Sequence, residues 1–330
     1  MKHFTLTFGN VGYGEAMLFE LSDPSSKRGV FSVLFDGGGA DPETFHNPSA
    51  GQHPFIEHLK KLGIDHIDAV IISHIHEDHV SGLVPIVKAY PPKIVYQTLP
   101  PDFWRTEMKP LSAEAGETVS LQKFTRSLND FREICEHTTK TGGKVVQVGL
   151  GETLSFPDGL TAFAVVPNRE KVLILQSLLK ELYRTADDKV PDQSLLQKLD
   201  GYMNNVSLGF RFDYGKAHLL LAGDTNRAGF EGVDTGELKA DLYKVGHHGQ
   251  IDGADESLLR AISPKVVVCC ASCDRLYNSA HPDLLRLIHN QGAELWFSDC
   301  PPNVAGEPVP PHEFLRIHID NAGGIKARYF

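Results

Sequence analysis

The chain has 330 residues, of which 41% are apolar and 22% charged, a composition typical of a globular protein. Its formal net charge of −10 argues against a surface that holds long nucleic acid by releasing counterions. The longest apolar runs are too short to cross a bilayer, and the N-terminus lacks the apolar stretch of a signal peptide, so we expect a cytoplasmic protein without membrane contact.

The first third of the sequence predicts a series of strands that ends at a cluster of polar residues. Apolar and polar residues alternate in the first two of these segments, and the third leads into the turn Asp36-Gly-Gly-Gly39. Residues 52–62 carry apolar side chains at helical spacing, and a second helix is expected to begin at Val80. The strands are predicted at 4–8, 15–21, 30–35, 67–73 and 93–97.

Two polar stretches, 101–140 and 168–203, have helical patterns and interrupt the strands. We interpret them as insertions that are long enough to cover a site, and we expect the choice of substrate to depend on them. Because both halves of the chain contain strands followed by helices, we expect one domain, residues 1–330, built from two similar halves. The remaining segments predict strands at 144–148, 160–166, 206–214, 217–222, 242–245, 265–270, 294–298 and 314–320, and a helix at 281–291.

The segment His74-Ile-His-Glu-Asp-His79 directly follows an apolar predicted strand and contains four potential metal ligands within six residues. Packing of a buried strand does not require such a cluster. Imidazole and carboxylate together suit a borderline divalent ion such as zinc, manganese or iron. The dense spacing suggests room for two ions.

Two further predicted strands end in residues of the same kind. The apolar segment 217–222 runs into Gly223 and Asp224, and the segment 242–245 runs into a Gly-His-His-Gly sequence at 246–249. Ligands at strand ends can converge on one edge of a sheet. The three segments together therefore predict a metal centre.

These motifs, in this order, resemble the metallo-β-lactamase superfamily, and within it the hydrolase domain attached to competence DNA-uptake channels (the ComEC-like subgroup). The resemblance covers most of the chain. Each motif alone is a weak signal, but all of them together and in this order are specific. Besides the cluster at 74–79 it rests on Gly9-Asn-Val-Gly-Tyr-Gly-Glu-Ala16, Leu34-Phe-Asp-Gly-Gly38, Asn204-Asn-Val-Ser-Leu208, Leu220-Leu-Ala-Gly-Asp224, Lys244-Val-Gly-His-His-Gly249 and Asn278-Ser-Ala-His-Pro282.

The resemblance implies an α+β fold, a four-layer αββα sandwich with helical insertions, and two divalent metal ions, zinc or manganese, at one edge between the sheets. It implies a role for each motif residue, and it makes His248 the less expected ligand of the adjacent histidine pair. The implied ligands are His74 and His76 for the first ion, Asp78 and His79 for the second, Asp224 as a bridge, and His247 to complete the second site.

The sequence departs from the wider superfamily at Asn204 and Asn205. Many members supply a third histidine to the first metal at this place, whereas the ComEC-like subgroup has the same two asparagines. An amide oxygen suits a harder ion than zinc, so manganese becomes a serious candidate. Alternatively, the two asparagines only cap the entry to a strand.

Two other residues are candidates for supporting roles. His281, before a proline, could contact the leaving group or a phosphate oxygen, or it could simply start a helix. Asp36 is expected to hold the metal-binding loops by hydrogen bonds, or to be a turn residue only.

The function that these features imply is a metal-dependent hydrolase in which a metal-bridged hydroxide attacks a phosphodiester, with Asp78 and His281 as catalytic residues. The substrate would be a nucleotide, a short nucleic acid or a phosphorylated small molecule, and the sequence indicates no obligate protein partner. One alternative is a lactonase, thioesterase or β-lactam hydrolase on the same fold. Another is a metal-binding regulatory module without turnover.

Overall fold

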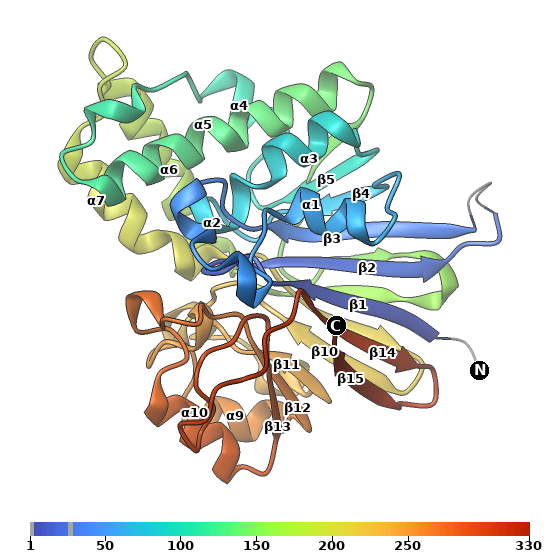
Figure 1. The fold of residues 1–330 in the computed structure, drawn as a ribbon. Coiled ribbons are helices and arrows are strands. Elements are labelled where there is room, and N and C mark those ends of the chain that lie inside the picture. Colours follow the sequence, from blue (N-terminus) through green and yellow to red (C-terminus); the bar gives the residue numbers. More distant parts are fainter. Residues whose placement is uncertain (1–2, 26–28) are drawn as a thin grey trace.

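The computed structural model describes residues 3–25 and 29–330, whose strands form two mixed sheets (Figure 1). The first sheet has the order β15-β14-β1-β2-β3-β4-β5-β6 and becomes parallel from β3 onward. Its strands are β1 (His3–Gly9), β2 (Ala16–Ser22), β3 (Val30–Gly37), β4 (Ala69–Ile71), β5 (Ile94–Gln97), β6 (Lys144–Gln147), β14 (Phe314–Asp320) and β15 (Ile325–Tyr329).

The second sheet is built from the following part of the chain. Its order is β13-β12-β11-β10-β9-β8-β7, and the strands from β10 to β13 are parallel. They are β7 (Thr153–Ser155), β8 (Thr161–Val166), β9 (Gly209–Tyr214), β10 (Ala217–Leu221), β11 (Leu242–Lys244), β12 (Val266–Cys269) and β13 (Glu294–Phe297).

Alternation along the strands separates three apolar clusters. In β2, Met17 and Phe19 point to a cluster between the two sheets, where they meet Phe210 and Phe212 of β9, whereas Leu18 points to the outer face of the first sheet. Helices cover both outer faces, so the expected α+β, four-layer αββα sandwich is confirmed (Figure 1). The helices are α1 (Phe55–Lys61), α2 (Glu77–Val80), α3 (Leu83–Ala89), α4 (Phe103–Thr106), α5 (Val119–Lys140), α6 (Arg169–Thr185), α7 (Gln193–Tyr202), α8 (Arg227–Phe230), α9 (Glu256–Ile262) and α10 (Pro282–Asn290).

The polar stretches 101–140 and 168–203 contain the helices α4 to α7, which lie over the first sheet (Figure 1). The longer three begin at side-chain caps, because Thr118, Asn168 and Asp192 each accept a hydrogen bond from a backbone N–H of the first turn. That these stretches are insertions into one domain stays a prediction. Among the described residues, no helix combines the length and apolar character needed to cross a membrane.

Some element boundaries differ from the expected ones. The strand predicted to begin at residue 206 begins at Gly209, because Met203–Val206 form a 3₁₀ turn. The helix expected from Val80 is preceded by α2, which already begins at Glu77. This earlier start places Asp78 and His79 on a helical turn instead of a loop.

The junction between α2 and α3 packs directly on the end of β3, and Gly82 makes this possible. A Cβ atom on Gly82 would lie 2.1 Å from the carbonyl oxygen of Gly37, and the Gly82 N–H donates to the Gly38 oxygen at 2.8 Å. We therefore expect Gly82→Ala to lower the free energy of unfolding by about 1–3 kcal/mol in urea titrations, because α2 must move away from β3.

Gly149→Ala provides the control for this substitution. The nearest atom to a Cβ on Gly149 is 3.6 Å away, an ordinary contact, so its effect should stay within about 0.5 kcal/mol. Equal effects of the two substitutions would show that close packing at Gly82 does not fix α2.

Candidate metal centre

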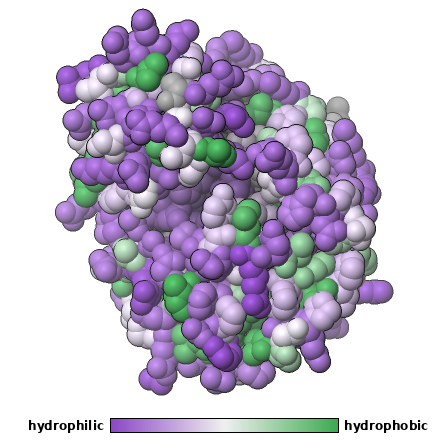
Figure 2. All heavy atoms as spheres, turned by 60° about the vertical axis from the view of Figure 1, so that its left-hand side comes forward, coloured by the Kyte–Doolittle hydropathy of each residue, from purple (hydrophilic) through white to green (hydrophobic). Residues whose placement is uncertain are grey.

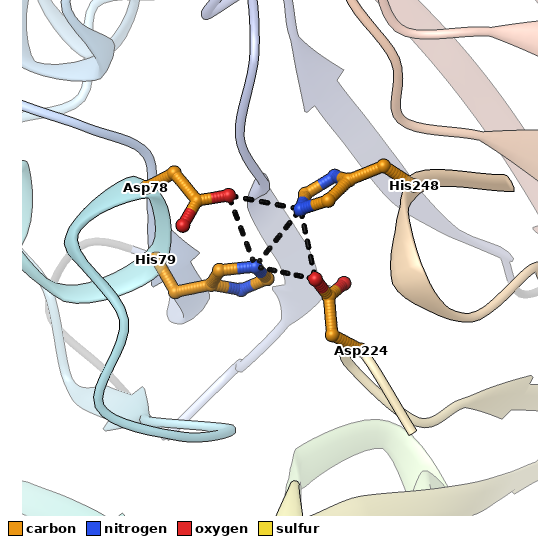
Figure 3. Close-up of side chains that lie close together, drawn as sticks. All are labelled: Asp78, His79, Asp224 and His248. Atoms are coloured by element: carbon orange, nitrogen blue, oxygen red, sulfur yellow. Dashed lines mark hydrogen bonds and ion pairs between the residues drawn. The ribbon is translucent and has the colours of Figure 1, made fainter. Parts of the chain in front are cut away.

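At one edge of the sandwich, helix α2 and the segments after β10 and β11 bring four ligand-type side chains together (Figure 3). Asp78 and His79 come from α2, Asp224 follows β10, and His248 follows β11. One ligand atom from each residue lies within 4.8 Å of the others. His248 Nε2 is 2.9 Å from Asp78 Oδ2 and 2.8 Å from Asp224 Oδ2. We call these four residues the Asp78–His248 cluster.

The donor set of this cluster fits a divalent cation. His79 Nε2 lies 3.3 Å from Asp224 Oδ2 and also 3.3 Å from His248 Nε2, so two imidazole nitrogens and two carboxylates face one small volume. His79, Asp224 and His248 are buried. Imidazole nitrogen and carboxylate oxygen are ligands that zinc and manganese accept.

The electrostatics of the cluster show how strongly it attracts positive charge. Burial lowers the pKa of His248, but the carboxylates of Asp224 and Asp78 outweigh burial and raise that pKa to about 9. Burial likewise opposes a charge on His79, yet Asp224 and Asp78 hold its pKa well above the usual range. A metal ion would replace these protons, so binding should release protons and weaken at low pH.

Asp36 contacts His79 on the side of the ring that faces away from the cluster. Its Oδ2 lies 2.8 Å from His79 Nδ1, and its carboxylate accepts hydrogen bonds from the Ser73 N–H and hydroxyl at 2.8 and 2.6 Å. Because Asp36 can only accept, His79 carries its proton on Nδ1 and presents Nε2 to the cluster. Such a carboxylate–histidine contact fixes ring orientation and raises the basicity of the ligand nitrogen.

His74 and His76 lie beside the cluster and not within it. Their facing nitrogens, His74 Nε2 and His76 Nδ1, are 3.0 Å apart, and the His74 ring lies 4.2 Å from the His79 ring. Burial and the neighbouring His79 and His76 hold the pKa of His74 well below its usual range, so His74 is neutral and can act as a ligand. The Asn204 side-chain oxygen is buried and has no hydrogen-bond partner among the described residues.

The structure differs from the expectation at the adjacent histidines. It brings His248, and not His247, to the cluster: His247 Nδ1 contacts Asp252 Oδ1 at 2.8 Å on the cleft side. Both histidines have left-handed backbones, with φ values of 48° and 49°, so the chain turns sharply after Gly246. This turn directs His248 inward, where the Cys270 carbonyl oxygen is 2.8 Å from its Nδ1.

His281 and Asn205 do not join the cluster. His281 precedes α10, and its Nδ1 accepts a hydrogen bond from the Asp283 N–H at 3.2 Å. It is not among the described residues that line the cleft, so the expected contact with a leaving group has no geometric support. The Asn205 side-chain oxygen is buried without a hydrogen-bond partner in the described chain.

Sequence reasoning did not identify a buried ion pair behind Asp224. Lys244 and Glu15 are both fully buried and in direct contact, and Lys244 Nζ lies 3.2 Å from Asp224 Oδ1 and 3.0 Å from the Gly223 carbonyl oxygen. Burial alone would lower the pKa of Lys244, but the carboxylates of Glu15 and Asp224 keep it well above its usual range. The charged Lys244 inside the otherwise apolar segment 242–245 could have indicated such an ion pair.

A polar cleft of about 580 Å³ opens at the cluster. Figure 2, which brings the left-hand side of Figure 1 forward, shows a hollow with a largely hydrophilic surface beneath the upper helices. One wall comes from α5 and α7 and the other from the loop that carries Tyr277. The lining residues that bear on function are Tyr13, His76, Asp78, Lys123, Asp200 and Asn204.

The buried ion pair gives a stability test. Lys244→Met would leave the Glu15 carboxylate buried without its cation, and we expect a loss of about 3–5 kcal/mol in urea unfolding of the metal-free protein. Adding Glu15→Gln should recover part of this loss, because the uncompensated charge is then removed. If the two single losses simply add in the double variant, the two side chains are not energetically coupled.

The adjacent histidines give a matched pair for metal binding. We expect His248→Ala to weaken the binding of Zn²⁺ or Mn²⁺ by more than about 100-fold, since loss of an outer hydrogen-bond partner alone costs about 10–100-fold. His247→Ala should leave the affinity almost unchanged. Calorimetric titration of both metal-free variants measures the difference, and the reverse order of effects would place His247 at the ion.

The chain is similar in sequence to a known protein family and to a known bacterial protein. A model of the metallo-beta-lactamase superfamily matches residues 30–168, a region that contains Asp36 and the segment 74–79. The chain is 24% identical over 299 residues to ComE operon protein 3 of Bacillus subtilis (strain 168). The match covers 88% of this chain but 31% of the relative, so the chain spans about a third of that protein.

Solved structures with a similar arrangement include two of low sequence identity. A diphosphatase from the PhnP family is 15% identical, with a TM-score of 0.42 and coverage of 89% of this chain and 94% of that one. Zn(2+)-bound PqqB from Methylobacterium extorquens is 13% identical, with a TM-score of 0.42 and coverage of 89% and 97%. The match to the metallo-beta-lactamase superfamily therefore covers residues 30–168, and the strands of this region belong to the two sheets described above.

Proposed function

We propose that this protein is a metal-dependent hydrolase with two divalent ions, zinc or manganese, and that it cleaves a phosphodiester in a nucleotide, a short nucleic acid or a phosphorylated small molecule. The observation that carries the proposal is the convergence of the Asp78–His248 cluster at a polar cleft. A cytoplasmic location belongs to the same proposal.

Divalent ions in such a site supply positive charge that polarises a phosphoryl or carbonyl oxygen and makes water more acidic. The chain contributes orientation. Asp36 fixes the His79 ring, the Cys270 carbonyl oxygen fixes the His248 ring, and Lys244 holds the outer oxygen of Asp224. The centroid of the Tyr13 ring lies 4.4 Å from that of the His248 ring, so Tyr13 packs against His248 at the wall of the cleft.

Several features favour a phosphodiester as the substrate. The chain is similar in sequence to ComE operon protein 3 over 299 residues, and its motifs resemble those of a hydrolase domain attached to DNA-uptake channels. An amide at position 204, where many relatives have a histidine, favours a harder ion, and Lys123 adds a cation to the cleft wall. The acidic residues Glu77, Asp200 and Asp252 in the same cleft, with the net charge of −10, favour a short substrate over a long polyanion.

A substrate panel tests the proposal. Metal-free protein is loaded with Mn²⁺ or Zn²⁺ and assayed with bis(p-nitrophenyl) phosphate, a lactone and nitrocefin. We expect turnover of the phosphodiester, and a loss of at least about 100-fold in kcat for Asp78→Asn, because this variant removes a charge that holds the ion beside the reacting bond.

Each other outcome has a defined meaning. Turnover of the lactone or nitrocefin alone would contradict the phosphodiesterase proposal and identify a hydrolase of carbonyl compounds. Full metal loading without turnover of any compound would favour a metal-binding regulatory module.

A further inference from the structure

We propose that Asp200, in the last turn of α7, is a positioning residue for His76 and thereby couples this helix to an ion held by His74 and His76. The inference rests on the two-ion centre of the proposed function. His76 Nε2 lies 3.3 Å from Asp200 Oδ1 and 3.2 Å from the Asp200 carbonyl oxygen.

These two contacts fix the proton on His76. A carbonyl oxygen only accepts hydrogen bonds, so Nε2 must carry the proton that it donates to the Asp200 carbonyl, with the Asp200 carboxylate beside it. The Nδ1 atom of neutral His76 is then a bare nitrogen with a free lone pair. It points at His74 Nε2, 3.0 Å away.

The proton on His74 is fixed in a similar way from the other side. The Ser73 hydroxyl donates its single proton to Asp36 Oδ2 at 2.6 Å, so at His74 Nδ1, 2.9 Å away, it can only accept. His74 therefore carries its proton on Nδ1, and its Nε2 is also bare. Two bare nitrogens 3.0 Å apart repel one another unless a proton or a metal cation lies between them.

Asp200 is well placed to act on this pair. Leu196 and Leu199 of α7 are fully buried, which anchors the last turns of the helix against the core. The two oxygens of Asp200 hold the orientation of the His76 ring, as outer hydrogen-bond partners do at histidine ligands. Four residues further on, Asn204 also lines the cleft, and its buried side-chain oxygen has no hydrogen-bond partner among the described residues. Through Asp200, the stretch 168–203 therefore contacts the proposed ligand His76.

The test compares Asp200→Ala and Asp200→Asn with Glu181→Ala, which removes an exposed carboxylate from α6. Metal-free proteins are titrated with Mn²⁺ against a competing chelator, and His74→Ala identifies which equivalent depends on the histidine pair. We expect Asp200→Ala to weaken that equivalent by about 10–100-fold and to leave the other unchanged. Asp200→Asn should lie between, because the amide keeps an acceptor but lacks the charge.

A second readout separates positioning from a general structural role. In the unsubstituted protein, the equivalent that depends on His74 should slow amide hydrogen exchange over residues 193–206, and in Asp200→Ala this protection should be lost. Equal affinities in Asp200→Ala and Glu181→Ala, or a single bound ion in the unsubstituted protein, would overturn the inference. Neither readout needs turnover, so a failed substrate panel leaves this result interpretable.

Discussion

The buried carboxylate of Asp224 is the interaction on which the site depends. It meets His248 and His79 on one side and Lys244 on the other, and its side chain is almost fully buried at the base of the cleft. An isolated carboxylate at this depth would be strongly unfavourable. Residues from three different strand ends therefore have to meet at Asp224. The negative charge of Asp224, which would also bind an ion, holds together β10, β11 and the Lys244–Glu15 pair.

Much of the fold was predictable because it depends on local periodicity. The apolar alternation of β2 and the amphipathic patterns of α5 and α6 follow directly from the spacing of residues. The pairing of the sheets was predictable only through the resemblance to a family, because β14 returns from the end of the chain to pair with β1. No local pattern encodes a contact between residues more than 300 positions apart.

The candidate site was predictable in part. The segment 74–79 and Asp224 were visible because metal-ligand types follow apolar strands. Which of His247 and His248 faces the cluster depends on the left-handed backbone conformation of both residues. The sequence has no glycine at either position that would have predicted this conformation. Lys244 and Asp200 contact side chains that are distant in sequence, Glu15 and His76, so these contacts could be found only in the three-dimensional arrangement.

The helices over the first sheet contact the segments that carry the candidate metal ligands. His76 contacts α7 on one face and His74 on the other, and His74 reaches Asp36 through Ser73. A crystal structure of the protein grown with Mn²⁺ or Zn²⁺, with ions located by anomalous scattering, tests the central claim most directly. We expect an ion bound by Asp78, His79, Asp224 and His248. An ion bound through His247, or a cluster that stays free of metal at saturating concentration, would contradict it.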